Sequence, residues 1–210
     1  MAFAGVMNDL TFFADQRRNK NFEQTHRQLI ERAVELISGG SSASLSVATL
    51  AREAGMNRST VYYHFESREA LMAEVKLWVG RQLGEILLGY GDQVLRVEKA
   101  ILFVLANSSV VHLWVRDLVE NGAINQHFPS WDTLVGKVES GFLNSRGGVQ
   151  RASAEVGDGE LWSTVLLTIA VAAPRLYQFA VRPDEDHQKI ARRFAKAYGR
   201  LRGALREPVL

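Results

Sequence analysis

The sequence contains no cysteine, and this absence excludes several kinds of site. Disulfide bonds, thiolate metal centres and cysteine nucleophiles all need a cysteine sulfur, so this chain can supply none of them. The absence also fits a reducing compartment, and we expect the protein to be cytoplasmic. The first fifteen residues contain no lysine or arginine, so they do not resemble a secretory signal.

Strong net charge and long apolar runs are scarce as well. The chain has 25 basic and 23 acidic residues, and its net charge of +2 excludes a protein that is basic throughout, as a histone-like binder would be. Any contact with DNA must therefore come from a local basic patch. The most apolar stretch, 161–174, is shorter than the roughly 20 residues needed to cross a bilayer, so we expect a buried helix there and no membrane partner.

Common catalytic motifs are also missing. The five histidines include no pair spaced four residues apart, and the glycines form no phosphate-binding or dinucleotide-binding pattern. We therefore predict no catalytic residues, no metal site and no cofactor. A Ser–His–Asp site stays open as an alternative, because such sites assemble in space without a fixed sequence spacing.

The segment from Ser46 to Ala70, SVATLAREAGMNRSTVYYHFESREA, is the most informative part of the chain. Its first part predicts an amphipathic helix, because apolar residues recur there at helical spacing. These residues are Val47, Leu50, Ala51 and Ala54. Gly55 suits the positive φ that follows a helix end, and Asn57 is a good N-cap for a second helix.

The second helix of this segment is unusually polar. We expect Val61, Tyr62 and Phe65 to anchor it against the rest of the domain. The side chains that it would expose are Arg58, Ser59, Thr60, Tyr63 and His64. Short side chains and an arginine near a helix N-terminus can approach base edges in a major groove closely. The segment therefore predicts a helix-turn-helix.

A known family shares its residues and their spacing with three pieces of the chain, AVELISGG, SVATLAREAGM and NRSTVYYHFESREALM. The most specific part is the pattern at Tyr62, His64 and Phe65. It is followed by Ser67, Arg68, Glu69 and Leu71. On these residues, the run from about 25 to 75 resembles the DNA-binding domain of the tetracycline-repressor (TetR) family of transcription regulators. Arg68 stands where that family usually has lysine, which keeps the charge but changes the contact geometry.

The resemblance implies roles for the exposed residues. It implies base-edge contact for Arg58, Ser59 and Tyr63, and Arg58 is the best candidate to bond guanine O6 and N7 together. It implies contact with the phosphate backbone for another group, which comprises Ser46, Thr60, Tyr62, His64 and Arg68. The alternative for His64 is a surface histidine without a role on DNA. The alternative for Tyr62 is a ring that packs in the core and a hydroxyl that points outward. For Phe65 we favour packing alone.

We predict an all-α fold, in which an N-terminal three-helix helix-turn-helix domain precedes a larger helical domain for ligand binding and dimerisation. The predicted parts are an extension at 1–21, the DNA-binding domain at 22–68 and the larger domain at 69–210. The extension carries a basic cluster, Arg17, Arg18 and Lys20, that reaches a minor groove or belongs to a solvated tail.

Helical spacing and glycine-rich breaks predict the remaining elements. The first helix is expected at 22–38, and Ser67 caps a long helix that ends near 88. Further helices are expected at 92–106, 109–121, 130–144, 159–181 and 184–207, with a mobile loop at 144–160. Asp158 is the predicted cap of the helix at 159–181.

The last two helices suggest a partner subunit. Between Leu161 and Val181 the only charged residue is Arg175, and a helix that is apolar on nearly every face must be buried on nearly every face. The resemblance implies a four-helix interface in a homodimer. Its predicted contacts are Trp162, Leu166, Ile169, Ile190, Phe194, Tyr198 and Leu201. The basic residues of the last helix we interpret as a solvated face.

The resemblance also implies a small-molecule effector that enters the larger domain. Aromatic side chains with a few polar groups line such cavities. The candidates are Phe103, Trp114, Trp131, Arg175 and Tyr177. The same aromatics fit an ordinary core, and Arg175 alternatively forms an ion pair.

The function expected from these features is that of a homodimeric, ligand-responsive repressor that binds a palindromic operator in double-stranded DNA. An activator and a ligand-independent regulator are alternatives within the same family. A helical adaptor that binds another protein is a third alternative. The sequence does not identify the effector or the operator.

Overall fold

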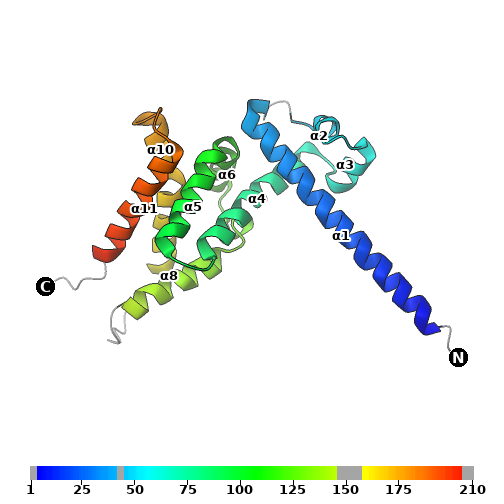
Figure 1. Cartoon of the computed structure of the whole chain (residues 1–210), viewed down its shortest axis with the longest axis horizontal. Coiled ribbons are helices and arrows are strands. Elements are labelled where there is room, and N and C mark those ends of the chain that lie inside the picture. The colour runs from blue at the N-terminus through cyan, green and yellow to red at the C-terminus, as the bar shows by residue number, and fades with distance from the viewer. Residues whose placement is uncertain (1–3, 42–44, 146–157, 205–210) are drawn as a thin grey trace. The chain divides into compact units, whose positions relative to one another are not determined.

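The computed structural model describes the backbone of residues 4–41, 45–145 and 158–204, and the side chains of residues 20–40, 45–140 and 159–201. The chain divides into two compact units, Met1–Val75 and Lys76–Leu210. Every regular element of the described residues is helical (Figure 1), which confirms the predicted all-α fold. No helix in the described part is long and apolar enough to span a membrane.

The first helix is much longer than predicted. Helix α1 spans Ala4–Leu36, so the backbone of the extension is helical and continues into the DNA-binding domain. The predicted start at residue 22 was wrong, because no glycine or proline occurs between Val6 and Ser38 to interrupt the helix. The helix ends in the π-type turn η1 (Ile37–Ser41), where Gly40 has a φ of 92°.

The two helices of the predicted motif form as expected. Helix α2 spans Val47–Glu53 and α3 spans Arg58–His64. The hydroxyl of Ser46 accepts a hydrogen bond from the Thr49 amide at 3.0 Å, and Asn57 Oδ1 accepts one from the Ser59 amide at 3.2 Å. Gly55, between the helices, has a φ of 64°, which an L side chain rarely adopts. These contacts confirm the helix-turn-helix geometry.

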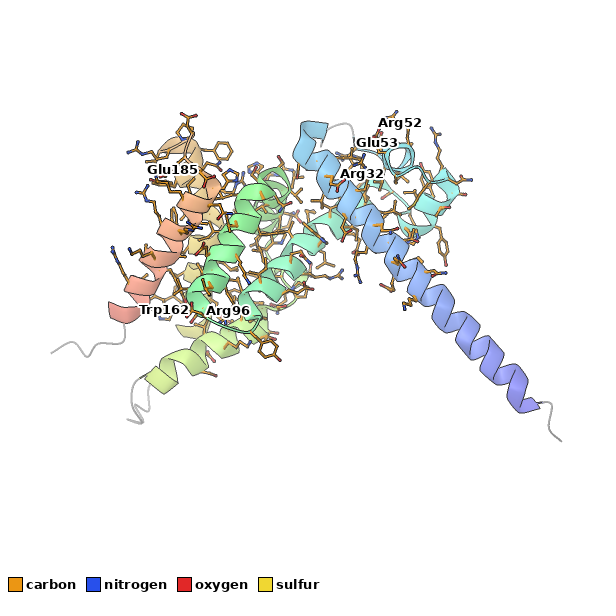
Figure 2. The ribbon with its side chains drawn as sticks, viewed as in Figure 1. Arg32, Arg52, Glu53, Arg96, Trp162 and Glu185 are labelled. Atoms are coloured by element: carbon orange, nitrogen blue, oxygen red, sulfur yellow. The ribbon has the colours of Figure 1, made fainter. Side chains whose placement is uncertain are left out.

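The core of the first unit lies between α1, α2 and α3. It consists of Leu29, Ala33, Leu50, Val61 and Phe65, all nearly inaccessible to solvent. Arg32 on α1 also reaches Glu53 on α2, with an N–O distance of 3.6 Å (Figure 2). Apolar burial is the main stabilising contribution here, since exposed ion pairs contribute little.

Helix α4 spans Arg68–Leu88, and the hydroxyl of Ser67 accepts a hydrogen bond from the Ala70 amide at 3.1 Å, as predicted. The following helices also lie within a residue or two of their predicted places. They are α5 (Gln93–Ala106), α6 (Ser108–Asn121) and α8 (Trp131–Ser145). The short helix α7 (Ile124–His127) was not predicted, because a single turn carries no periodic apolar pattern.

The second unit is held together by α5 and α11 (His187–Ala204), which lie side by side (Figure 1). Helix α11 begins after Asp186, whose carboxylate accepts a hydrogen bond from the Lys189 amide at 3.1 Å. The predicted start near Asp184 was therefore slightly early. Helix α8 packs against α9 (Asp158–Leu167) in the same unit.

The helix predicted at 159–181 is not one regular helix. It consists of α9, the π-helical segment η2 (Thr168–Ala172) and α10 (Ala173–Ala180). Proline lacks an amide hydrogen, so Pro174 removes one backbone hydrogen bond at the point where the regular pattern is interrupted. Asp158 is the first residue of α9 instead of its predicted cap, and 146–157 of the predicted loop lie outside the described residues.

Candidate nucleic-acid interface

The exposed face of α3 carries the residues for which base contact was predicted. Arg58, Ser59 and Thr60 are exposed in its first turn, and Tyr63 has 68% of its surface exposed. Val61 is completely buried beneath them. The helix therefore has one anchoring side and one polar side, which suits an element that enters a groove.

The predicted packing of the Tyr62 ring was wrong, because 49% of its surface is exposed and the ring does not belong to the core; its contact with the phosphate backbone stays a prediction. Phe65, one helical turn after Val61, takes the anchoring place instead and is 1% exposed. Tyr62 and Tyr63 thus both lie on the outer side of α3. Their hydroxyl groups can donate to phosphate oxygens or base edges.

His64 is only partly exposed, so the alternative of a surface histidine was wrong, while its contact with the phosphate backbone stays a prediction. Its ring stacks on Phe22 of α1, with 4.3 Å between the ring centroids. Its Nδ1 atom is buried without a hydrogen-bond partner among the described residues. Burial, together with the nearby His26, lowers the pKa of His64 below its ordinary value of 6.5. At neutral pH the ring is therefore uncharged.

The two remaining candidates flank α2 and α4. Ser46 caps α2, so its hydroxyl and the first amides of that helix lie together where an anion is favoured. Arg68 opens α4, and its Nε donates a hydrogen bond to the Leu45 carbonyl at 2.8 Å. This bond ties the start of α4 to the residue before Ser46, and it orients a cation beside that helix end.

Sequence reasoning missed Phe22 and His26, which contact the end of α3 from α1. The two rings stack on each other one helical turn apart, with centroids 5.7 Å apart. His26 also lies 4.8 Å from the ring of Phe65. Phe22 and His26 are four residues apart at the predicted start of the helix, and this spacing could have indicated that the two rings lie on the same helix face.

The predicted effector residues are not gathered around one described cavity. Trp114 and Trp131 are buried, and Trp114 Nε1 donates to the His127 carbonyl at 2.9 Å. Phe103 lies half-buried against Trp78. For both tryptophans the core alternative fits the structure, because both rings are buried and the indole N–H of Trp114 has a hydrogen-bond partner.

Arg175 and Tyr177 on α10 have different surroundings. The guanidinium of Arg175 lies 5.9 Å from the ring centroid of Phe179, and its Nε is buried without a hydrogen-bond partner among the described residues. The predicted ion pair of Arg175 is not found among those residues. Tyr177 accepts a hydrogen bond from Arg193 at 2.7 Å.

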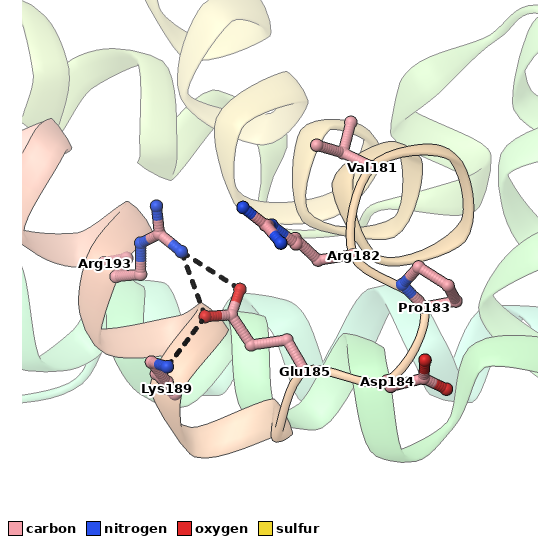
Figure 3. A pocket seen from close by; sticks show the side chains of 7 residues that line it. All are labelled: Val181, Arg182, Pro183, Asp184, Glu185, Lys189 and Arg193. Carbon is pink, nitrogen blue, oxygen red and sulfur yellow. Dashed lines mark hydrogen bonds and ion pairs between the residues drawn. The ribbon is translucent and has the colours of Figure 1, made fainter.

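A polar pocket of about 480 Å³ lies at the turn between α10 and α11 (Figure 3). Its lining consists of Val181, Arg182, Pro183, Asp184, Glu185, Lys189 and Arg193. None of the five predicted effector residues lines it. Glu185 already pairs with Arg193 at 3.0 Å and with Lys189 at 3.4 Å, so its charges are largely satisfied internally.

The predicted subunit contacts need correction. Leu166 is 6% exposed and Ile190 is 0% exposed, so both are buried inside the subunit and cannot lie on an interface. Four others are half-buried, namely Trp162, Ile169, Phe194 and Tyr198. Leu201 is exposed. The prediction that these segments are helical was right, but it assigned the wrong helix faces to the interface. Faces that contain Leu166 and Ile190 are buried where α9 packs against α8 and α11 packs against α5.

An exposed, uncharged stripe runs along α9, η2 and α10 instead. It comprises Leu161, Thr164, Thr168, Ala172, Leu176 and Phe179, which follow one another at intervals of three or four residues. Leu161, Leu176 and Phe179 are each more than half exposed. A contiguous apolar stripe of this kind is typical of a surface that another molecule covers.

Three comparisons relate this chain to known proteins. A family model described as "Bacterial regulatory proteins, tetR family" matches residues 29–75. The HTH-type transcriptional regulator AcrR of Shigella flexneri is 24% identical over 98 residues, which cover 44% of this chain and 46% of the relative. The match thus spans about half the length of that curated relative.

A solved structure agrees over most of the chain. It is that of a TetR-family transcriptional regulator from Pectobacterium atrosepticum, with a TM-score of 0.55 and 17% identity over 87% of this chain and 94% of the other. At this identity the similarity establishes the fold. The fold and the interface define an all-helical protein with an N-terminal helix-turn-helix domain. Residues 29–75 are thus similar to the DNA-binding domain of the tetR family, and the fold of the chain is similar to that of a TetR-family regulator.

Proposed function

We propose that the protein is a transcriptional regulator that binds a specific site in double-stranded DNA through α3. The observation that carries this proposal is the arrangement of α3. Val61 and Phe65 fix it from beneath, while Arg58, Ser59 and Tyr63 stand exposed. An arginine fork, a hydroxyl and an aromatic on one short helix are the groups that read a major groove.

The proposal includes a homodimer. A single helix of seven residues reads few base pairs, whereas two copies related by a twofold axis read a palindrome with much greater specificity. The uncharged stripe on α9, η2 and α10 is the surface that we assign to this contact. Its exposure in one subunit supports a partner that covers it.

Repression is the mode of action that we propose, because a dimer seated on a promoter excludes other proteins from the same DNA. A reporter gene placed behind the bound site tests this mode. Higher expression after deletion of the regulator supports repression, and lower expression identifies an activator.

An acidic, partly aromatic effector is the ligand class that we propose. Burial lowers the pKa of Arg175 below its ordinary value, which reflects the cost of a charge without a counter-charge. A ligand carboxylate would supply that charge, and Phe179 beside it offers an aromatic face.

A thermal-shift screen with benzoate and phenylacetate, each paired with its amide, tests the effector class. We expect the acids to raise the melting temperature and the amides to leave it unchanged, since ligands that bind the folded state stabilise it. The variant Arg175→Gln should lose the shift. Equal shifts for acids and amides, or an undiminished shift in the variant, would contradict the proposal.

Selection of bound duplexes from a random pool tests the function itself. We expect a palindromic site whose affinity falls steeply with salt, because phosphate contacts release counterions. The adaptor alternative draws support from the same exposed stripe, and it predicts no enriched sequence together with a mixed complex. Absence of enrichment at every salt concentration would refute the DNA-binding proposal.

A further inference from the structure

Four aromatic rings meet where α1 passes the end of α3. Phe22 stacks on His64 with 4.3 Å between centroids, and it meets Tyr63 edge to face at 5.5 Å. His26, one turn along α1, lies 5.5 Å from His64. Phe22 and His26 precede residues 29–75, the part that matches the family model. One side of the contact therefore lies upstream of the matched region, and the other side, Tyr63 and His64, lies within it.

Helix α3 needs such a contact at its C-terminal end. It has only seven residues, and a helix this short is unstable in water without tertiary packing. Asn57 holds its first turn through a cap, and Val61 holds its middle. The last two residues, Tyr63 and His64, have the rings of α1 as their packing partners. Aromatic pairs of this kind stabilise a fold beyond the apolar area that they bury.

The stacking also fixes which edge of His64 faces outward. Its Nδ1 is buried without a partner, and Nε2 is the ring nitrogen that is not buried in this way. A proton on Nδ1 would leave a buried donor unsatisfied, so the neutral ring carries its hydrogen on Nε2. That N–H is then the single donor of the neutral ring.

We propose that Phe22 and His26 are positioning residues for DNA binding, which act by holding the rings of Tyr63 and His64 in the orientation that contacts the duplex. This inference rests on the proposed function. Phe22 stacks on His64 and meets Tyr63 edge to face, and His26 contacts Phe65 and His64 from the next turn of α1. Neither residue needs to touch DNA itself.

The titratable groups near the four rings determine how the stability that these rings contribute depends on pH. His26 faces His64 from α1, and Glu74 of α4 lies 3.8 Å from His26 Nε2. Because the pKa of His64 is lowered, the folded state resists its protonation. The stability that the cluster contributes is present above pH 6.5 and is lost as the pH falls through the folded pKa.

A mutant cycle on the selected operator tests the positioning role in the full chain. We expect Phe22→Ala to weaken operator affinity about tenfold, and Phe22→Tyr to restore it. In a Tyr63→Ala/His64→Ala background, Phe22→Ala should change affinity less than about twofold, because the rings that it orients are gone. The exposed neighbour Gln24→Ala is the matched control and should bind as the wild type does.

Two further measurements separate positioning from general loss of structure. Nuclear magnetic resonance titration of the histidine rings should show the pKa of His64 rising toward 6.5 in Phe22→Ala, independently of DNA. His64→Gln, which keeps a donor near the Nε2 position, should retain more affinity than His64→Asn.

The outcomes are distinct. Equal losses from Phe22→Ala in both backgrounds, or no loss in either, would overturn the positioning role while wild-type binding stands. If the wild type selects no duplex at all, the proposed function fails and the positioning role fails with it.

Discussion

Arg58 occupies the first position of α3, with its guanidinium exposed and no ion pair to the described residues. An arginine without an internal partner loses no structural contact when it bonds a base. Its fork matches the O6 and N7 acceptors of guanine, whereas a lysine supplies only a point charge. For Arg58 we therefore expect the shape of the guanidinium to provide specificity for one base, and its charge to provide affinity for DNA.

Arg58→Ala should weaken operator binding by about 1–3 kcal/mol and relax the preference at one base pair. Arg58→Lys separates the two roles, because it keeps the charge and removes the fork. We expect it to keep affinity for random DNA and to lose discrimination at the same base pair, as measured by fluorescence anisotropy. Equal losses on operator and random DNA would identify Arg58 as a phosphate contact.

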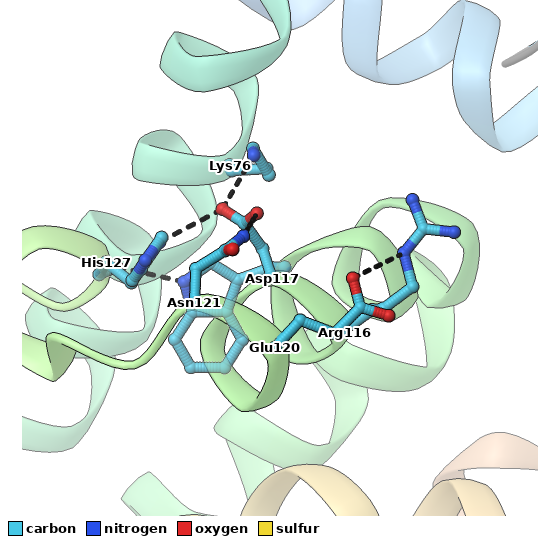
Figure 4. Close-up of polar contacts among 7 residues, drawn as sticks. Lys76, Arg116, Asp117, Glu120, Asn121 and His127 are labelled. Atoms are coloured by element: carbon cyan, nitrogen blue, oxygen red, sulfur yellow. Dashed lines mark hydrogen bonds and ion pairs between the residues drawn. The ribbon is translucent and has the colours of Figure 1, made fainter.

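A cluster of polar side chains joins α4 to α6 and α7 in the second unit (Figure 4). Asp117 accepts hydrogen bonds from Lys76 at 2.6 Å and from Asn121 at 2.7 Å, and His127 lies 3.3 Å away. The helices are close here because Gly80 has no side chain, and a Cβ there would overlap the His127 carbonyl. The cluster therefore anchors the middle of α4 to the α6–α7 corner.

Asp117→Asn should lower the free energy of unfolding by about 1–3 kcal/mol at neutral pH, because it removes charge-assisted hydrogen bonds from a mostly buried group. The hydrogen bond from Lys76 is the main reason that the pKa of Asp117 is lowered from 3.8. A carboxyl group whose pKa is lowered by folding stabilises the fold at a pH above its pKa in the unfolded state. This stabilisation is lost as the pH falls through its pKa in the folded state.

The difference between Asp117→Asn and the wild type should thus be constant from pH 7 to about 5 and shrink below the ordinary pKa of 3.8. Urea denaturation across this range measures it. Glu120→Gln is the matched control, since the partner of that exposed carboxylate among the described residues is Arg116 at 4.0 Å, a pair that should contribute less than about 1 kcal/mol. A difference that grows toward acid pH would contradict this account.

The whole molecule is proposed to act as a pair of subunits. Each subunit presents the uncharged stripe on α9, η2 and α10, and burial of such a stripe against a copy of itself stabilises a dimer through the hydrophobic effect. A twofold pair of DNA-reading units follows from that contact. Loss of the pair should reduce operator affinity more than affinity for an isolated half-site.

Leu176→Glu should dissociate the dimer, because it places a charge within the uncharged stripe. Sedimentation velocity should then show the mass of one chain, and operator affinity should fall at least about tenfold. Val119→Glu is the control, since Val119 on α6 is equally exposed but does not belong to the stripe. An unchanged dimer in Leu176→Glu would refute the assignment of this surface.

The helix-turn-helix was predictable from the sequence because its signals are local. Gly55 and Asn57 each act on the backbone within a few residues, and the structure places both as predicted. The start of α1 was missed for the same reason, because the interval from Val6 to Ser38 contains no local stop signal and the predicted boundary relied on the apolar stripe alone.

The sequence by itself determined that the chain is all-helical and that one polar helix follows a glycine turn, since helical period and capping depend on neighbouring residues. Only the tertiary structure decided which face of each helix is buried. Packing of α11 on α5 placed Ile190 inside the subunit, and the passage of α1 beside α3 brought Phe22 against His64. Contacts between residues far apart in the chain depend on how helices pack, and a period of 3.6 residues does not specify the partner of each face.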